Sequence, residues 1–142
     1  MKRNLLTIVS LVVMSLMLNT AGAYAQSYVK ANVPFAFNVG TAEMPAGTYE
    51  IKVLSQSTIL IQNRATGAGA FSIARREDRG KTEGKLVFDR IGTEYFLTEA
   101  WTSLGAPGII VPTSKHEKEL KKELELGKSS YGDYKKVVVA LK

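Results

Sequence analysis

The sequence predicts an all-β protein, mainly antiparallel, in which a meander forms a small β-sandwich or barrel and one C-terminal helix lies on the surface. Apolar and polar residues alternate from Tyr28 to Trp101, and short turn-forming segments divide the alternating stretches. After Pro107 the period changes to that of a single helix. Local sequence leaves the choice between sandwich and barrel open, because either one buries the apolar face of a meander.

The first 25 residues have the pattern of a secretory signal peptide. Lys2 and Arg3 form a positive start, a mostly apolar run covers residues 5–18, and an Ala-Tyr-Ala tripeptide ends at Ala25. An apolar run of about 14 residues is shorter than the roughly 20 that span a membrane as a helix. We therefore expect cleavage after Ala25, no transmembrane segment after cleavage, and a secreted or periplasmic protein.

Composition limits what the remaining chain, a predicted single domain over residues 26–142, can do. The predicted cleavage removes Lys2 and Arg3 and no acidic residue, so the formal net charge falls from +6 to +4. Such a mild charge argues against a nucleic-acid partner. The chain has no Cys and one His, which excludes disulfides and thiol chemistry and leaves little for a metal site. Packing alone must hold this domain together.

The first predicted strand follows the alternating residues 28–40. Pro34 lies inside this stretch and cannot donate a backbone hydrogen bond, so we expect the strand to lie at a sheet edge or to bend at Pro34. A Met-Pro-Ala-Gly turn at residues 44–47 precedes the next alternating stretch, which runs from Tyr49 to Val53.

Four more strands are predicted at hairpin spacing, at residues 58–62, 70–75, 85–91 and 94–101. The segments between them are short and rich in turn formers, which favours antiparallel neighbours. A β-branched run at residues 136–141 predicts a final strand, which we expect to lie beside the first.

A surface helix is predicted near residues 115–126. Ser114 and Glu117 have the spacing of a capping box, and a glycine follows the helical stretch. Leu120 and Leu124 lie one turn apart and form a narrow apolar stripe. We expect the helix to contact the sheet through these two leucines.

The sequence predicts no catalytic, cofactor-binding or metal-ligating residue. His116 is expected to be solvated, because it begins a charged helix and no second His or Cys accompanies it. Glu94 and Glu99 lie on one predicted strand, where an odd separation puts them on opposite faces and disfavours a joint role. The adjacent Glu77 and Asp78 are expected at a solvated hairpin tip.

Two further segments carry charge or glycine without forming a known site. The connection from residue 75 to residue 85 is rich in basic residues, but interspersed acids weaken its field, so we expect a solubilising role. Residues 66–70 read Thr-Gly-Ala-Gly-Ala, which lacks the Lys-Ser/Thr ending of a phosphate-binding loop and leads into a strand.

Several motifs together resemble those of a family of small exported proteins common in acidobacterial genomes. They are VPFAFNVG at residues 33–40, MPAGTY at residues 44–49, FL at residues 96–97 before Trp101, and PTSKHEKEL at residues 112–120. These motifs supply core aromatics, a turn and a helix cap. The resemblance therefore implies an exported all-β domain and carries over no catalytic residue.

These observations favour an exported, non-catalytic binding or structural module of the periplasm or cell envelope. Another envelope protein or a glycan is the expected partner, and no cofactor is predicted. The alternative is a carboxylate-dependent hydrolase acting on envelope or extracellular polysaccharide, since paired carboxylates can cleave glycosides without His or Cys. A third hypothesis is pairing with another chain through the edge of the first or the last strand.

Overall fold

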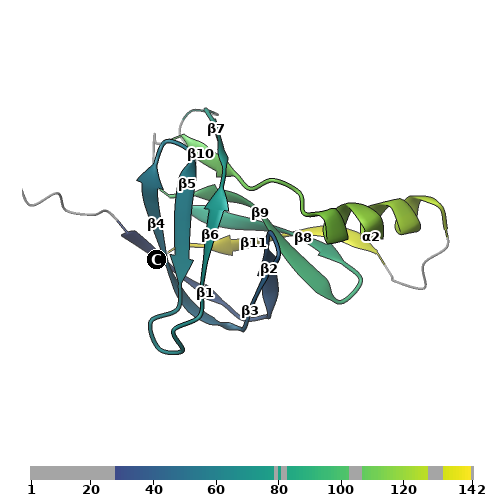
Figure 1. Cartoon of the computed structure of the whole chain (residues 1–142), viewed down its shortest axis with the longest axis horizontal. Coiled ribbons are helices and arrows are strands. Elements are labelled where there is room, and N and C mark those ends of the chain that lie inside the picture. Colours follow the sequence, from purple (N-terminus) through teal and green to yellow (C-terminus); the bar gives the residue numbers. More distant parts are fainter. Residues whose placement is uncertain (1–27, 79, 81–82, 103–106, 128–132, 142) are drawn as a thin grey trace, which may run out of the picture.

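The structure is a computed structural model that describes residues 28–78, 80, 83–102, 107–127 and 133–141. The predicted signal peptide lies outside these residues. The elements (Figure 1) are β1 (Tyr28–Val33), β2 (Phe37–Val39), β3 (Ala42–Met44), β4 (Gly47–Ser55), β5 (Thr58–Gln62), β6 (Gly69–Ile73), β7 (Arg75–Glu77), β8 (Lys85–Ile91), β9 (Glu94–Trp101), β10 (Gly108–Ile110), α2 (Lys115–Glu125) and β11 (Tyr134–Ala140).

The strands form two sheets that enclose one main core. The first sheet has the order β1-β4-β5-β6, and the second has the path β11-β8-β9-β10-β7, with the β2–β3 hairpin attached to β9. In Figure 1, β4, β5 and β6 run across β8, β9 and β11. The second sheet curls into a half-barrel, so the fold combines features of a sandwich and a barrel. The predicted all-β class, mainly antiparallel with one C-terminal helix, is confirmed.

The connectivity departs from a simple meander. β1 pairs with β4 and skips the β2–β3 hairpin, and Asn38 of β2 aligns with Phe96 of β9 in a parallel pair. The short strands β3, β7 and β10 were not predicted. Each has three residues, which is too short for an alternating pattern to be read from sequence.

Pro34 divides the first predicted strand. β1 ends at Val33, β2 begins at Phe37, and β1 lies at one end of the first sheet. Phe35 lies in this break, packs against the core, and stacks on Tyr95 with 3.9 Å between the ring centroids. Both expectations for Pro34, an edge position and a bend, are confirmed.

The last strand lies next to the first, as predicted, but its main pairing partner is β8. β11 pairs along its whole length with β8, from Tyr134 opposite Ile91 to Ala140 opposite Lys85. Backbone pairing with the first strand is limited to one bridge, between Ala31 and Leu141, the residue that follows β11. A β-branched run predicts a strand but not its partner, because the choice of partner depends on residues far away in the chain.

Aromatic and branched side chains fill the main core between the sheets. Phe37 contacts Tyr49 and Phe88 edge-on, with centroid distances of 5.1 and 5.2 Å. Trp101 is buried beneath β10, where a Cβ atom on Gly108 would lie 2.3 Å from the indole ring. Only glycine fits at position 108 unless the tryptophan moves.

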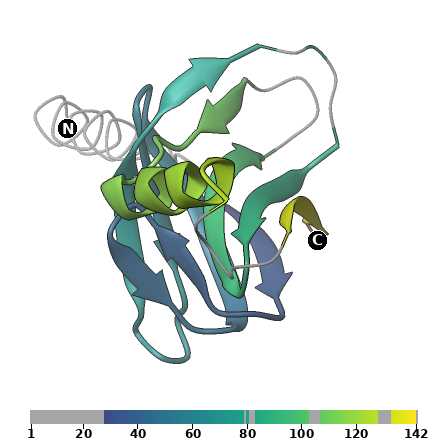
Figure 2. The same cartoon turned by 90° about the vertical axis from the view of Figure 1, so that its right-hand side faces the viewer.

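The helix α2 begins and ends where the sequence predicts. The Ser114 side chain accepts a hydrogen bond from the Glu117 N–H at 3.1 Å, and Gly127 follows the helix at φ 62°. Leu120, with Leu124 beside it, packs into a small second cluster on the outer side of β8 and β9. Figure 2 shows α2 crossing in front of the strands. The predicted contact through the leucines is confirmed.

Candidate functional site

A groove runs along the outer edge of β6, and we call it the seam. It has a volume of about 590 Å³ and is lined by residues 39–42, 69–73 and 112–114. One wall is β6, and the opposite wall is the turn of the β2–β3 hairpin with the segment that leads into α2. None of these lining residues is charged.

Hydrogen bonds at the two ends of the β5–β6 hairpin set which β6 residues face β5. Asn63 N–H donates to the Ala68 carbonyl at 2.7 Å, and Ala74 N–H donates to the Ser57 carbonyl at 2.8 Å. The register between these ends has no shift. In an antiparallel pair, the backbone N–H and C=O groups of every second residue point toward the partner strand. The backbone groups of the even-numbered residues of β6 therefore point toward β5.

The odd-numbered residues Gly69, Phe71 and Ile73 therefore direct their backbone N–H and C=O groups into the seam. β6 pairs with no strand other than β5 among the described residues. The Ser72 hydroxyl donates to the Ile73 carbonyl at 3.1 Å. Within the described ranges, the three N–H groups and the other two carbonyls have no hydrogen-bond partner in the protein.

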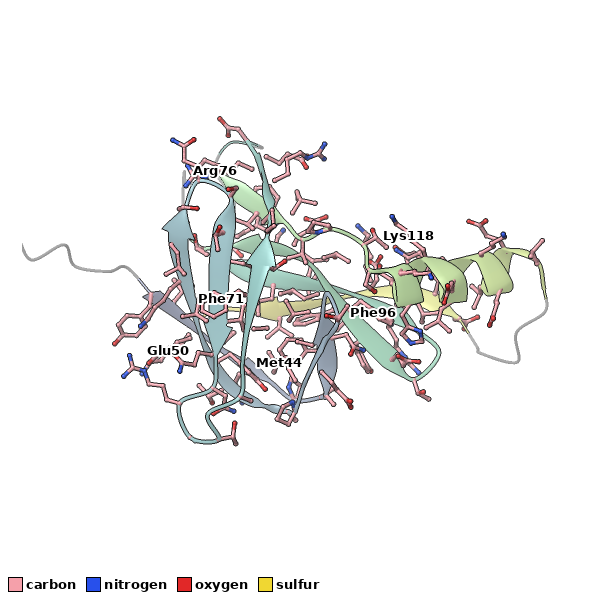
Figure 3. All side chains as sticks on the ribbon, viewed as in Figure 1. Met44, Glu50, Phe71, Arg76, Phe96 and Lys118 are labelled. Carbon is pink, nitrogen blue, oxygen red and sulfur yellow. The ribbon has the colours of Figure 1, made fainter. Side chains whose placement is uncertain are left out.

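Two large apolar side chains stand beside these backbone groups. Phe71 and Ile73 lie on the outer face of the first sheet with 70% and 75% of their surfaces exposed. They are the two most exposed large hydrophobic residues among those described. Figure 3 labels Phe71. The seam thus combines an unpaired strand edge, an uncharged lining and the exposed side chains of Phe71 and Ile73, which we call the apolar ridge.

His116 lies against Glu94 at the start of α2. Its Nε2 is 2.9 Å from Glu94 Oε2, and its ring lies 5.9 Å from that of Phe96. His116 is largely exposed, as expected, but it has a carboxylate partner that the sequence did not indicate. These two residues and Glu43 line a hollow of about 350 Å³, so this hollow brings together two carboxylates and the imidazole.

Glu94 and Glu99 share one face of the second sheet, which corrects the prediction from their odd separation. They lie opposite Ile91 and Val87, which are four residues apart and therefore on the same side of β8. A bulge in β9 at Thr98 reverses the alternation. The two carboxylates still act separately, because Glu99 accepts a hydrogen bond from the Trp101 indole N–H at 3.0 Å and Glu94 contacts His116.

Glu77 does not lie at a hairpin tip, which corrects a second prediction. It is the last residue of β7 and aligns with Gly108 of β10. Asp78 does lie in a turn, where its carboxylate accepts a hydrogen bond from the Gly80 N–H at 3.0 Å. Part of the basic connection, including Arg79 and Lys81, lies outside the described residues.

Sequence reasoning missed a buried ionic cluster between β8 and α2, formed by Asp89, Glu117 and Lys121. The Lys121 ammonium lies 2.7 Å from Asp89 Oδ2 and 2.8 Å from Glu117 Oε1. The two carboxylate side chains are only 5% and 3% exposed. Asp89 Oδ1 is buried without a hydrogen-bond partner in the described part of the chain. The i,i+4 spacing of Glu117 and Lys121 was the available signal.

The cluster shifts two pKa values upward. Burial lowers the pKa of Lys121, but hydrogen bonds and charge attraction from Asp89 and Glu117 outweigh it, and the net pKa lies above its ordinary value. Tyr134 lies beside the cluster, with Lys121 Nζ 5.6 Å from its ring centroid. Burial, followed by the negative charge of Asp89, raises the pKa of Tyr134.

Comparison of the chain with protein-family models, with curated proteins and with solved structures finds no match. The described ranges contain no helix that is both long and apolar enough to cross a membrane. They also contain no group of three or more His, Asp or Glu side chains arranged to hold a metal ion.

Proposed function

We propose that the protein is an exported, non-catalytic binding module of the periplasm or cell envelope, and that the seam is its binding site. The seam is the observation that carries the proposal. Monomeric proteins rarely leave an unpaired strand edge and a large apolar ridge together in solvent without a use for them. The signal-peptide pattern over residues 1–25 supports export.

A second candidate is the carboxylate-dependent hydrolase. It is favoured by the hollow that Glu43, Glu94 and His116 line. A pair of carboxylates flanking a glycosidic bond can supply a general acid and a base or nucleophile. In this hollow, however, Glu94 already contacts His116 at 2.9 Å, which ties up one carboxylate oxygen. We therefore rank the binding module first.

One set of measurements separates the two candidates. The full chain would be expressed in a bacterial host with an outer membrane, and the exported protein purified. Its intact mass tests cleavage after Ala25. The protein would then be incubated with purified envelope polysaccharides and with synthetic peptides, and both bound ligand and released sugar would be measured.

We expect binding that Phe71→Ala weakens and no release of sugar. Val138→Thr is the matched control, because Val138 is also an exposed apolar residue but lies on β11, away from the seam. Release of sugar that Glu94→Gln or Glu43→Gln abolishes would establish the hydrolase instead. Retention of residues 1–25 on the isolated protein would contradict export with cleavage.

A further inference from the structure

We infer that the ligand of the seam is an extended polypeptide segment of another protein, which adds to β6 as a fifth strand of the first sheet. This inference rests on the proposed binding function and gives it a partner of stated chemistry. Three observations carry it: the pattern of free backbone groups, the side chains that flank them, and the way in which the other strand edges are covered.

The free backbone groups specify an extended chain. Free N–H donors recur at Gly69, Phe71 and Ile73, every second residue along β6, and free carbonyl acceptors lie at Gly69 and Phe71. A second strand offers acceptors and donors at the same spacing, since its own residues rise by about 3.3 Å each and alternate in direction. A glycan or a compact ligand has no such repeat. About five extended residues would match the length of β6.

The flanking side chains specify an uncharged, apolar segment. Residues of an added strand that lie opposite Phe71 and Ile73 share the outer face with them, where cross-strand pairs of aromatic and β-branched residues are stabilising. The seam lining contains no charged residue, so a charge placed there would lose water without gaining a partner.

The other edges of the two sheets are covered or protected. β1 and the end of β11 contact each other through the bridge between Ala31 and Leu141, so the edges proposed from sequence are partly occupied. β3 and β7 are also edge strands; each has three residues, and they carry Glu43 and the arginines Arg75 and Arg76, respectively. Short length and charge are the usual protections of an edge strand. β6 has neither charge nor proline, which marks it as the edge left open for pairing.

The test uses the exported protein and labelled, end-capped peptides of seven residues that alternate valine with threonine, measured by fluorescence anisotropy. Two further peptides carry N-methyl groups on the amides of the valines or on those of the threonines. Only one of these two sets of amides faces β6 in a paired strand. We expect one methylated peptide to bind like the parent and the other to lose about tenfold or more in affinity. Replacing the central valine with aspartate should also weaken binding.

Two variants of β6 separate backbone pairing from side-chain contact. Phe71→Ala removes the ring and keeps the N–H that points into the seam. Phe71→Pro removes both, and it spares the pairing with β5 because that N–H faces away from β5. We expect Phe71→Pro to bind the peptide at least several-fold more weakly than Phe71→Ala. Val138→Thr should bind the peptide as tightly as the unsubstituted protein does. Thermal melting verifies that each variant is folded.

The outcomes distinguish this inference from the proposed function. Equal binding of both methylated peptides, or equal affinities of Phe71→Pro and Phe71→Ala, would overturn strand addition. Binding of a polysaccharide but of no peptide, weakened by Phe71→Ala, would overturn the polypeptide partner and leave the binding module standing. A dimer in light scattering that Phe71→Pro converts to a monomer would show that a second copy of the chain occupies the seam. Hydrolysis of a glycan with no seam-dependent binding would overturn both.

Discussion

The surroundings of Phe88 and of Phe71 show two opposite uses of aromatic residues in one β-structure. Phe88 is fully buried and contacts the rings of Phe35 and Phe37, each with 5.2 Å between the centroids. Phe71 is mostly exposed beside backbone groups that no strand pairs. β6 contributes Ala70 to the core, whereas Phe71 lies outside it. Phe71 should therefore contribute little to folding.

Alanine substitution at these two positions should give the largest contrast. Phe88→Ala leaves a cavity in a packed core, which should lower the free energy of unfolding by about 3–5 kcal/mol. Phe71→Ala removes an exposed ring and should change it by no more than about 0.5 kcal/mol. Urea unfolding followed by circular dichroism measures both. A large loss of stability in Phe71→Ala would mean that the ridge is structural, and it would remove the main support for the seam.

Substitution of Lys121 should have the next largest effect. Lys121→Met keeps the length of the side chain but leaves Asp89 and Glu117 buried without their shared cation. Breaking a buried ion pair from one side is costly, and we expect a loss of about 2 kcal/mol or more. Lys118→Met is the matched control, because Lys118 lies on the same helix and is exposed. Equal urea midpoints for the two variants would show that the cluster does not hold α2 on the sheet.

Alkaline pH should lower the free energy of unfolding by a smaller amount. Burial raises the pKa of Tyr49 and Tyr134, and the net pKa of Lys121 is raised as well. The folded state therefore holds these protons more tightly than the unfolded state, so stability is complete below about pH 10 and falls as pH rises further. The urea midpoint should drop as the pH rises above about 10, and less so in Tyr134→Phe. An unchanged midpoint would contradict these shifts.

The sequence was sufficient to predict the strands that have a clear apolar–polar alternation and the helix that has a capping residue. The predicted strands at residues 58–62, 85–91 and 94–101 have the bounds of β5, β8 and β9. Ser114 caps the helix through the Glu117 N–H as the spacing indicates, while the Glu117 carboxylate accepts a hydrogen bond from Lys121. These features depend on residues within a few positions of each other, and for that reason one sequence is enough to find them.

The candidate site was not predictable in the same way. No local signal separates β6 from β5, since both are short strands of mostly apolar and small residues. The joint position of Glu94 and His116 depends on docking α2 against a hairpin 22 residues away in the chain. The burial of Asp89 depends on the same docking.

Composition, periodicity and capping thus determine the class of this protein: a cysteine-free β-domain with one surface helix, preceded by a segment with the pattern of an export signal. The tertiary structure alone decides which edge stays unpaired, which carboxylates are buried, and on which face Glu94 and Glu99 lie after the bulge at Thr98. The physical reason is the range of the interactions. Alternation and caps act between near neighbours, whereas strand order, docking and burial are set by contacts between distant segments, whose energies are decided only when the whole chain packs.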